Sequence, residues 1–180
     1  MEFICTKCGR KEPVTTRAAH CACGGLWRLA YEPPKFDLAE IDRNEWSLFR
    51  YRRFLALDDE SWRGVSMGEG MTPVVRLDDD VLLKMDYFMP TLSFKDRGAA
   101  ALIAHCKSIG VDQVVQDSSG NAGNAVAAYC ARSGIGCEIF VPEGTSPKKI
   151  DMIRAHSAVC TVCLLYTSDA ADELWGVDLG

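Results

Sequence analysis

Residues 113–130, QVVQDSSGNAGNAVAAYC, decide the fold. The first four residues, Gln113-Val114-Val115-Gln116, are predicted to form a strand. A turn-rich segment follows at 117–121, and a helical pattern with small apolar residues continues from 122 to 130. A strand that passes through a short polar loop into a helix is the repeating unit of a parallel α/β sheet.

The same alternation extends to both sides of this stretch. A strand is predicted at 81–85, followed by a helix that starts at an N-cap serine and runs over 93–109. On the other side, a strand is predicted at 137–141 and a third helix from about residue 146. Residues 65–162 are therefore predicted to form an α/β domain, part of a doubly wound parallel sheet.

Residues 1–32 have few aliphatic side chains and are rich in cysteine and glycine, so they cannot build a core of their own. Four of the nine cysteines lie here, at zinc-ribbon spacing: Cys5, Cys8, Cys21 and Cys23. The second pair is one residue closer than usual, and His20 with Cys23 meets the usual spacing. His20 is thus an alternative to Cys21 as the fourth ligand. Four ligands close the coordination shell, which favours a structural zinc over a catalytic one.

The remaining segments differ in composition. Pro33 and Pro34 begin a linker, and loosely spaced apolar residues up to residue 64 predict one or two amphipathic helices. Within them, the basic residues of 50–53 are interpreted as a solvated helix face, with a phosphate or partner contact as the alternative. Residues 163–180 do not continue the alternation and are similar to translated sequencing-adapter sequence. They are predicted to be a non-native tail after a truncated reading frame.

The composition is that of a globular chain, with 180 residues, 48% hydrophobic and 25% charged. Free cysteines and the lack of a signal or membrane-span pattern predict a cytoplasmic protein without a membrane contact. The net charge of −5 argues against nucleic-acid binding. Residues 1–36, however, hold six basic and three acidic residues. This keeps one non-enzyme alternative open, a zinc-ribbon binding module on an inert α/β domain.

Lys95 lies in the first turn of a predicted helix, two residues before Arg97. The helix dipole and the like charge both favour the neutral, nucleophilic amine if the site is also desolvated. On charge pattern alone a solvated lysine is the simpler interpretation. Lys84 is an alternative nucleophile but lies mid-strand, and Lys148 and Lys149 are predicted on a helix surface.

The loop at 118–124, SSGNAGN, offers backbone N–H groups, two hydroxyls and an amide to an anion at a helix N-terminus. A loop of this composition is more often a plain turn. Both this loop and Lys95 are expected at strand-to-helix junctions on one edge of the sheet. An amine and an anion-binding loop are therefore predicted to converge.

Three motifs in series carry a resemblance to a known family. They are GEGMTP at 68–73, PTLSFKDRG at 90–98 and SGN at 119–121. In this order they resemble the fold-type II pyridoxal-phosphate (PLP) enzymes of the tryptophan synthase β-like superfamily, and most closely the threonine synthases. Members of that group can begin with a zinc ribbon and a Trp/Arg-Tyr-Arg segment, as Trp46 and residues 50–52 do here. The similarity runs from Cys5 to about Ala158.

The resemblance implies a role for particular residues. Lys95 would be the Schiff-base lysine, and Asn121 would bond the cofactor's phenolic oxygen. Phe94 would pack beside the cofactor ring, and Gly120 would lie against the cofactor. The implied substrate-binding residues, for the amino-acid carboxylate, are Thr72, Ser118, Ser119 and Asn121. The family usually has glycine where this chain has Leu92, at a close backbone contact near the cofactor.

The activity implied is a threonine synthase reaction, from O-phosphohomoserine and water to threonine and phosphate, with PLP and a structural zinc. A serine or threonine dehydratase, or a β-replacement enzyme such as cysteate synthase, is the enzymatic alternative. The family's glycine-rich loop for the cofactor phosphate, and its partner for the pyridine nitrogen, are expected beyond residue 180. The implied partner is a small amino-acid substrate, and a homodimer is an assembly to consider.

Overall fold

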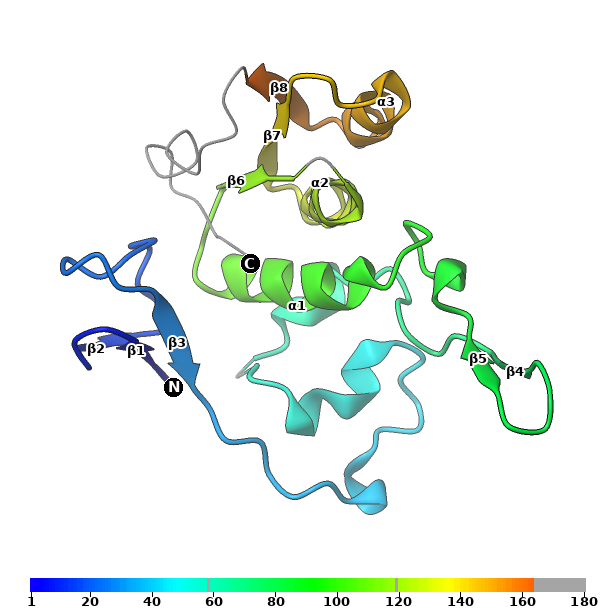
Figure 1. The fold of residues 1–180 in the computed structure, drawn as a ribbon. Helices are drawn as coiled ribbons and strands as arrows, with labels where there is room; N and C mark the ends of the chain where they lie inside the picture. The colour runs from blue at the N-terminus through cyan, green and yellow to red at the C-terminus, as the bar shows by residue number, and fades with distance from the viewer. Residues whose placement is uncertain (58, 119, 164–180) are drawn as a thin grey trace.

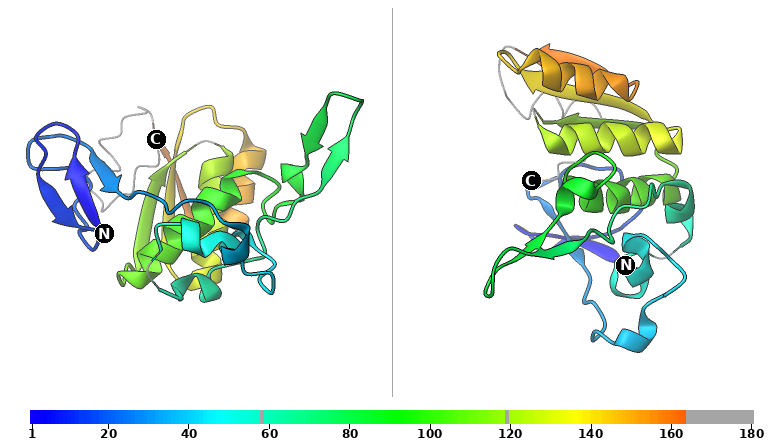
Figure 2. Two further views of the ribbon diagram at one scale, coloured as in Figure 1. Left: turned by 90° about the horizontal axis from the view of Figure 1, so that it is seen from below. Right: turned by 90° about the vertical axis from the view of Figure 1, so that its right-hand side faces the viewer.

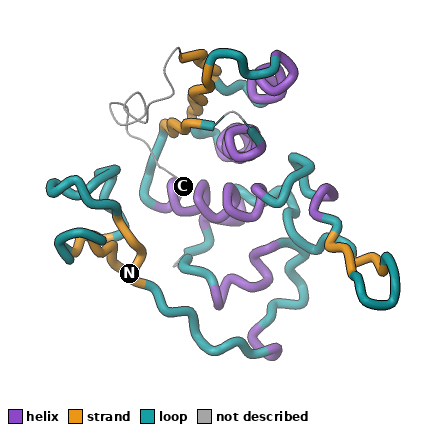
Figure 3. The backbone as a smooth tube through the Cα atoms, viewed as in Figure 1, coloured by secondary structure: helices purple, strands orange, loops and turns teal. Residues whose placement is uncertain are grey.

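The computed structural model describes residues 1–57, 59–118 and 120–163. Three sheets follow one another along the chain, an antiparallel three-stranded sheet, an antiparallel hairpin and a parallel three-stranded sheet (Figure 1). Figure 3 shows that the first half is mostly loop between short elements, whereas longer helices and strands gather in the second half.

The parallel sheet consists of β6 (Gln113–Asp117), β7 (Gly136–Pro142) and β8 (Val159–Cys163), in the order β6-β7-β8. Two helices, α2 (Asn121–Ser133) and α3 (Pro147–Ala155), connect the strands and lie on the same side of the sheet (Figure 1). The strands predicted at 113–116 and 137–141 are confirmed. Strand β8 was not predicted, and residues 164–180 of the predicted tail lie outside the described residues.

The strand predicted at 81–85 does not join the parallel sheet. It is β5 (Leu82–Lys84), which pairs antiparallel with β4 (Val74–Arg76) in a hairpin that projects from the body (Figure 2). Asp78 Oδ1 accepts the N–H groups of Asp80 and Val81 at 2.9 Å and closes the turn. An apolar run identifies a strand but not its partner, and here a tight turn supplies a partner only a few residues away.

Helix α1 (Lys95–Ser108) confirms the helix predicted over 93–109. Its buried side includes Ala99, Ile103 and Cys106, which enter the main core with residues of α2 and the parallel sheet. Gly110, at φ +70°, follows the C-cap, as expected for a residue that ends a helix.

Residues 33–64 form short 3₁₀ helices rather than the predicted amphipathic α-helices. They are Leu38–Glu40, Leu48–Phe54 and Ser61–Gly64. Phe49 and Trp62 stack with ring centroids 5.0 Å apart, and both belong to the main core. The segment therefore packs on the α/β domain through a few aromatic anchors instead of a continuous helical stripe.

The N-terminal sheet has β1 (Glu2–Cys5) between β2 (Lys11–Pro13) and β3 (Trp27–Ala30). Arg17 Nη2 donates to the carbonyls of Ile109 and Gly110, at 3.1 and 2.8 Å, and so links this sheet to the C-terminal end of α1. The hairpin β4–β5 lies at the opposite end of α1 (Figure 1). Among the described residues, none of the helices has the length and apolar character needed to cross a membrane.

Candidate functional site

The loop that leads to Lys95 is closed by a buried carboxylate. Asp96 is fully buried, and its Oδ2 accepts the Thr91 N–H at 2.7 Å. Asp96 Oδ1 accepts the Thr91 hydroxyl as well. These two bonds span five residues and hold the turn before α1 in a single arrangement. Lys95, the first residue of the helix, is therefore presented from a fixed backbone.

The Lys95 side chain is exposed and free of an acidic partner. Its backbone N–H donates to Ser93 Oγ at 3.3 Å, but the N-cap residue of α1 is Phe94 and not the predicted Ser93. Its Nζ lies 5.2 Å from the centroid of the Phe94 ring, itself 58% exposed. No carboxylate within the described ranges forms an ion pair with Lys95. The amine is thus available to an incoming carbonyl group.

Leu92 occupies a backbone position that suits glycine. Its φ is +62°, and its side chain is 69% exposed. A residue with a Cβ pays about 1–2 kcal/mol in the left-handed region. The family pattern places glycine here, and the structure supplies the physical reason. The strain lies three residues before Lys95, within the loop that Asp96 closes.

The second predicted loop leads from β6 into α2. Asn121 is the first residue of α2 and is exposed. Ser118 Oγ accepts the N–H groups of Gly120 and Gly123, at 3.3 and 3.0 Å, so its hydroxyl caps this helix start. A Cβ on Gly123 would lie 2.9 Å from the Ser118 carbonyl oxygen, which explains why glycine stands there. Ser119 lies outside the described residues.

Buried acceptors without partners lie on both sides of this loop. They are Gln116 Oε1, Asp117 Oδ1 and Asn124 Oδ1. The first two are at the end of β6, and the third is in the first turn of α2. Unsatisfied buried acceptors are rare in native structures and point to a missing donor. Gly120 lies between Asp117 and Asn124 in the sequence, and a Cβ added to it would meet no atom within 4 Å. There is therefore open space at this position.

Thr72 belongs to a polar network at the N-terminal end of α1. Its hydroxyl donates to Asp86 Oδ1 at 2.8 Å, and Arg97 Nη2 donates to the same oxygen at 2.9 Å. Lys84 Nζ donates to the Thr72 carbonyl. The hydrogen bond from Arg97 lowers the pKa of Asp86. This network joins the hairpin β4–β5 to the first turn of α1, two residues after Lys95.

Glu69 is a buried carboxylate that sequence reasoning missed. It accepts hydrogen bonds from Ser66 Oγ at 3.0 Å, Met67 N–H at 2.9 Å and Tyr129 OH at 2.9 Å. Burial, and then the charge of Glu69, raise the pKa of Tyr129. The sequence signal was only an acid between two glycines. The contacts show that Glu69 anchors the GEGMTP segment to α2.

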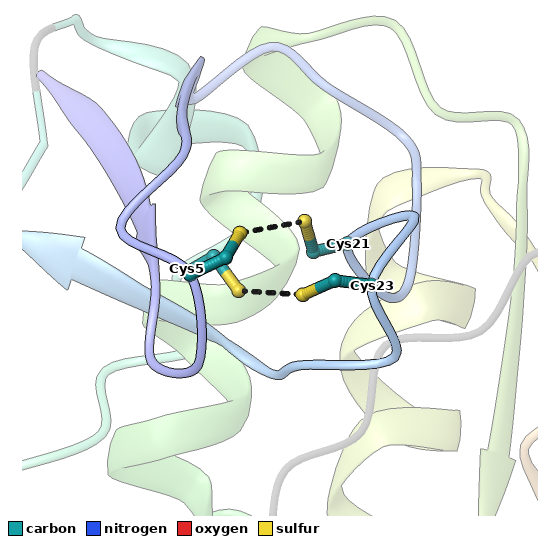
Figure 4. A group of neighbouring side chains, drawn as sticks. Cys5, Cys21 and Cys23 are labelled. Atoms are coloured by element: carbon teal, nitrogen blue, oxygen red, sulfur yellow. Dashed lines mark hydrogen bonds between the residues drawn. The ribbon is translucent and has the colours of Figure 1, made fainter.

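The four predicted cysteine ligands come together (Figure 4). All four Sγ atoms lie within 4.8 Å of one another. Cys5 and Cys23 are 3.5 Å apart, and Cys8 and Cys21 are 3.7 Å apart. A tetrahedral zinc with Zn–S bonds of about 2.3 Å needs sulfur atoms about 3.8 Å apart. The donor set therefore fits zinc, and it includes Cys21, the residue to which His20 was the alternative.

The electrostatics of this cluster also favour a cation. Hydrogen bonds from backbone N–H groups, first that of Cys8 and also that of Lys7, lower the pKa of Cys5 to about 6. The neighbouring thiols, Cys8 first and then Cys5, raise the pKa of Cys23 to about 12. The backbone N–H groups near Cys5 thus favour a thiolate at that residue. The other clustered thiols oppose further ionisation. A bound cation relieves that repulsion.

The structure thus has an exposed lysine at the start of α1, an asparagine at the start of α2, which packs against α1, and a parallel α/β sheet. The chain belongs to the family of pyridoxal-phosphate-dependent enzymes, whose model matches residues 65–175.

Within that family, the chain is similar to threonine synthases. It is 34% identical to the enzyme of Methanocaldococcus jannaschii over 152 residues, which cover 78% of this chain and 37% of the relative. It is 37% identical to the enzyme of Mycobacterium leprae over 116 residues, which cover 61% and 31%. The chain thus spans about a third of the length of these curated relatives.

Solved structures show the same fold. An O-ureido-L-serine synthase matches with a TM-score of 0.50 and 26% identity, covering 59% of this chain and 36% of that one. A diaminopropionate ammonia lyase of Escherichia coli matches with a TM-score of 0.53 and 23% identity, covering 63% and 39%.

The residues present fit pyridoxal phosphate. Lys95 offers an exposed amine, and there is open space at Gly120, beside Asn121 at the start of α2. The expectation that both loops lie at junctions of one sheet needs a correction, because the strand before Lys95 belongs to the hairpin. The two loops are related instead by the direct packing of α1 on α2.

Proposed function

We propose that this chain is part of a threonine synthase, a PLP-dependent lyase that converts O-phosphohomoserine and water to threonine and phosphate. One observation carries the proposal. Lys95 is an exposed, unpaired amine on a loop closed by Thr91 and Asp96, within a family whose reactions depend on such a lysine. The similarity to threonine synthases supports this reaction over others of the family.

Each residue of the site has a proposed task. PLP, when bound, supplies an electron sink for bonds at the substrate's α carbon. Lys95 holds the cofactor at rest, and its amine takes and returns protons at the substrate carbons. The Asn121 amide donates to the cofactor's phenolic oxygen, and the exposed Phe94 ring covers the cofactor ring. Gly120 leaves room for that contact because it has no side chain.

The substrate carboxylate is proposed to bind at the loop 118–121 and Thr72. The Thr72 hydroxyl donates to Asp86 in the structure, so its proton must turn before it can serve a carboxylate. Ser118 Oγ already accepts two backbone N–H groups, which leaves its hydroxyl proton free to donate. A structural zinc is proposed at Cys5, Cys8, Cys21 and Cys23.

The reaction is tested by incubating the PLP-loaded protein with O-phosphohomoserine and measuring released phosphate and threonine. Lys95→Ala should abolish both products, and Lys149→Ala, an exposed lysine on α3, should leave them unchanged. Undiminished turnover by the Lys95→Ala variant would reject the lysine assignment.

A second candidate is another reaction of the same family, a dehydratase or a β-replacement synthase. The 26% identity to an O-ureido-L-serine synthase supports keeping a β-replacement reaction as a candidate. The assigned residues serve the cofactor and not the choice of leaving group. Formation of 2-ketobutyrate from threonine, with no phosphate released from O-phosphohomoserine, would select a dehydratase and reject the threonine synthase assignment.

A further inference from the structure

The basic segment at 50–53 contains three arginines in different environments. Arg53 Nε pairs with Glu40 at 2.9 Å on the surface, as a solvated face predicts. Arg52 Nη2 pairs with Asp42 at 2.8 Å, and the Arg52 side chain is 28% exposed. Arg50 forms no ion pair with any carboxylate of the described residues. The solvated-face interpretation therefore holds for Arg53, which is exposed, whereas the Arg50 and Arg52 side chains are only partly exposed.

The guanidinium of Arg50 is poorly compensated. Its Nε is buried without a hydrogen-bond partner, and no other arginine within the described ranges has a buried nitrogen in this state. Its Nη1 faces the Met71 sulfur, which is a weak acceptor. The Tyr51 ring centroid lies 5.7 Å from the Arg50 Cζ. A thioether and an aromatic ring do not replace an anionic partner.

This side chain is fixed to the loop that leads into Thr72. The Leu48 N–H donates to the Glu69 carbonyl, two residues before Arg50. Gly70, at φ +100°, approaches so closely that a Cβ there would lie 2.8 Å from Leu48 N. The 3₁₀ helix that carries Arg50 and the GEGMTP segment are thus held in contact by backbone atoms.

The same loop connects Arg50 to the first turn of α1. Met71 faces the guanidinium, and the next residue, Thr72, is 3.4 Å from Arg97 Nη2 through its hydroxyl. Arg97 is neutralised by Asp86, whereas Arg50 is not. The structure therefore places an uncompensated cation against Met71, the residue before the candidate substrate-binding threonine.

We propose that Arg50 binds the phosphate group of the substrate, an assignment that rests on the proposed function. A guanidinium matches two oxygens of a phosphate with two N–H groups, and phosphate carries more charge than a carboxylate. The carboxylate already has donors at Thr72 and the loop 118–121. These donors carry no positive charge. Arg50 would supply one, because its guanidinium forms no ion pair with a carboxylate of the described residues.

The test uses the chain without PLP and measures the midpoint of thermal unfolding in phosphate and in chloride at equal ionic strength. Inorganic phosphate at about ten times its Kd should raise the midpoint by about 3 °C. The matched control Arg53→Gln should show the same rise. Arg50→Gln should lose the rise, and Arg50→Lys, which keeps the charge without the planar fork, should bind phosphate more weakly than the parent.

Several results would overturn the proposal. The first is that phosphate does not raise the unfolding midpoint of the parent protein. The second is that phosphate raises the midpoint of Arg50→Gln as much as that of the parent. If Arg50→Gln does not fold, an unchanged phosphate affinity in Arg50→Lys would overturn the proposal. An equal rise with acetate that also depends on Arg50 would make this a carboxylate site and reject the phosphate assignment. A purely structural arginine would lower the midpoint of Arg50→Gln equally in both salts and leave the phosphate-dependent rise intact.

The outcome is separable from that of the proposed function. Visible absorbance of the lysine–cofactor linkage reports on Lys95, and it should persist in Arg50→Gln. Loss of phosphate binding with that absorbance retained supports the Arg50 site. Absence of that absorbance in the parent would reject the Lys95 assignment while the phosphate titration still decides the role of Arg50.

Discussion

Asp96 accepts two hydrogen bonds from Thr91, one from its N–H and one from its hydroxyl, and these bonds close the loop that presents Lys95. Asp96 is fully buried, so both partners are sheltered from water. The position of Lys95, the proposed catalytic residue, therefore depends on a contact in which Lys95 itself takes no part.

Removing this contact should destabilise the protein. Asp96→Ala leaves two buried donors of Thr91 unpaired and should lower the free energy of unfolding by about 3 kcal/mol. Thr91→Val removes one bond only and should cost about 1.5 kcal/mol. Urea unfolding measures both, with the exposed Asp151→Asn as a neutral control. Equal stability of Asp96→Ala and the parent would contradict this role.

Leu92→Gly should stabilise the protein, against the usual effect of introducing glycine. The φ of +62° costs leucine about 1–2 kcal/mol, and the added chain entropy of glycine offsets part of that gain. We expect a net gain of about 0.5–1 kcal/mol in urea unfolding. Leu82→Gly, at an exposed position of β5, should destabilise instead. A loss of stability in both variants would argue against strain at Leu92.

The Asp86–Arg97 pair should make stability fall in acid. The hydrogen bond from Arg97 lowers the pKa of Asp86 below its ordinary value of 3.8. The carboxylate therefore contributes stability above that pH, and the contribution is lost as the pH falls through the lowered pKa. Asp86→Asn should lower stability by up to about 1 kcal/mol near neutral pH. Urea unfolding from pH 2 to 7 should show that the free energies of unfolding of variant and parent converge below pH 4. A difference in free energy that stays constant with pH would contradict a stabilising Asp86–Arg97 ion pair.

Metal analysis separates the two assignments of the fourth ligand. Cys21 Sγ lies within the sulfur cluster, so Cys21→Ser should lose most of the bound zinc. His20→Ala should retain about one zinc per chain. Both are measured on purified protein after dialysis against a weak chelator. Retention of zinc in Cys21→Ser together with its loss in His20→Ala would restore His20 as the ligand.

Much of the α/β part follows from local pattern. Helix α1, helix α2 and strands β6 and β7 were predicted within a few residues, because their apolar periodicity and glycine stops are local signals. The partner of β5 was not predictable, since pairing depends on the turn at 78–80 and on what covers each face. The 3₁₀ helices of residues 33–64 were also missed, because packing of Phe49 and Trp62 decides their conformation.

The candidate site divides in the same way. The cysteine cluster was predictable from spacing along the chain, whereas the roles proposed for Lys95 and Asn121 rest on the resemblance of their motifs to the family. Glu69 and the uncompensated state of Arg50 were not identifiable, because they depend on contacts between segments far apart in sequence. Tyr129, for example, reaches Glu69 across sixty residues.

The central claim is that Lys95 is the residue that holds the cofactor. The most direct measurement is to incubate the protein with PLP, reduce the linkage with borohydride, digest the product and locate the labelled lysine by mass spectrometry. We expect a label on Lys95 that is absent in Lys95→Ala and unchanged in Lys149→Ala. A label on Lys84, or no label on any lysine of the protein, would contradict it.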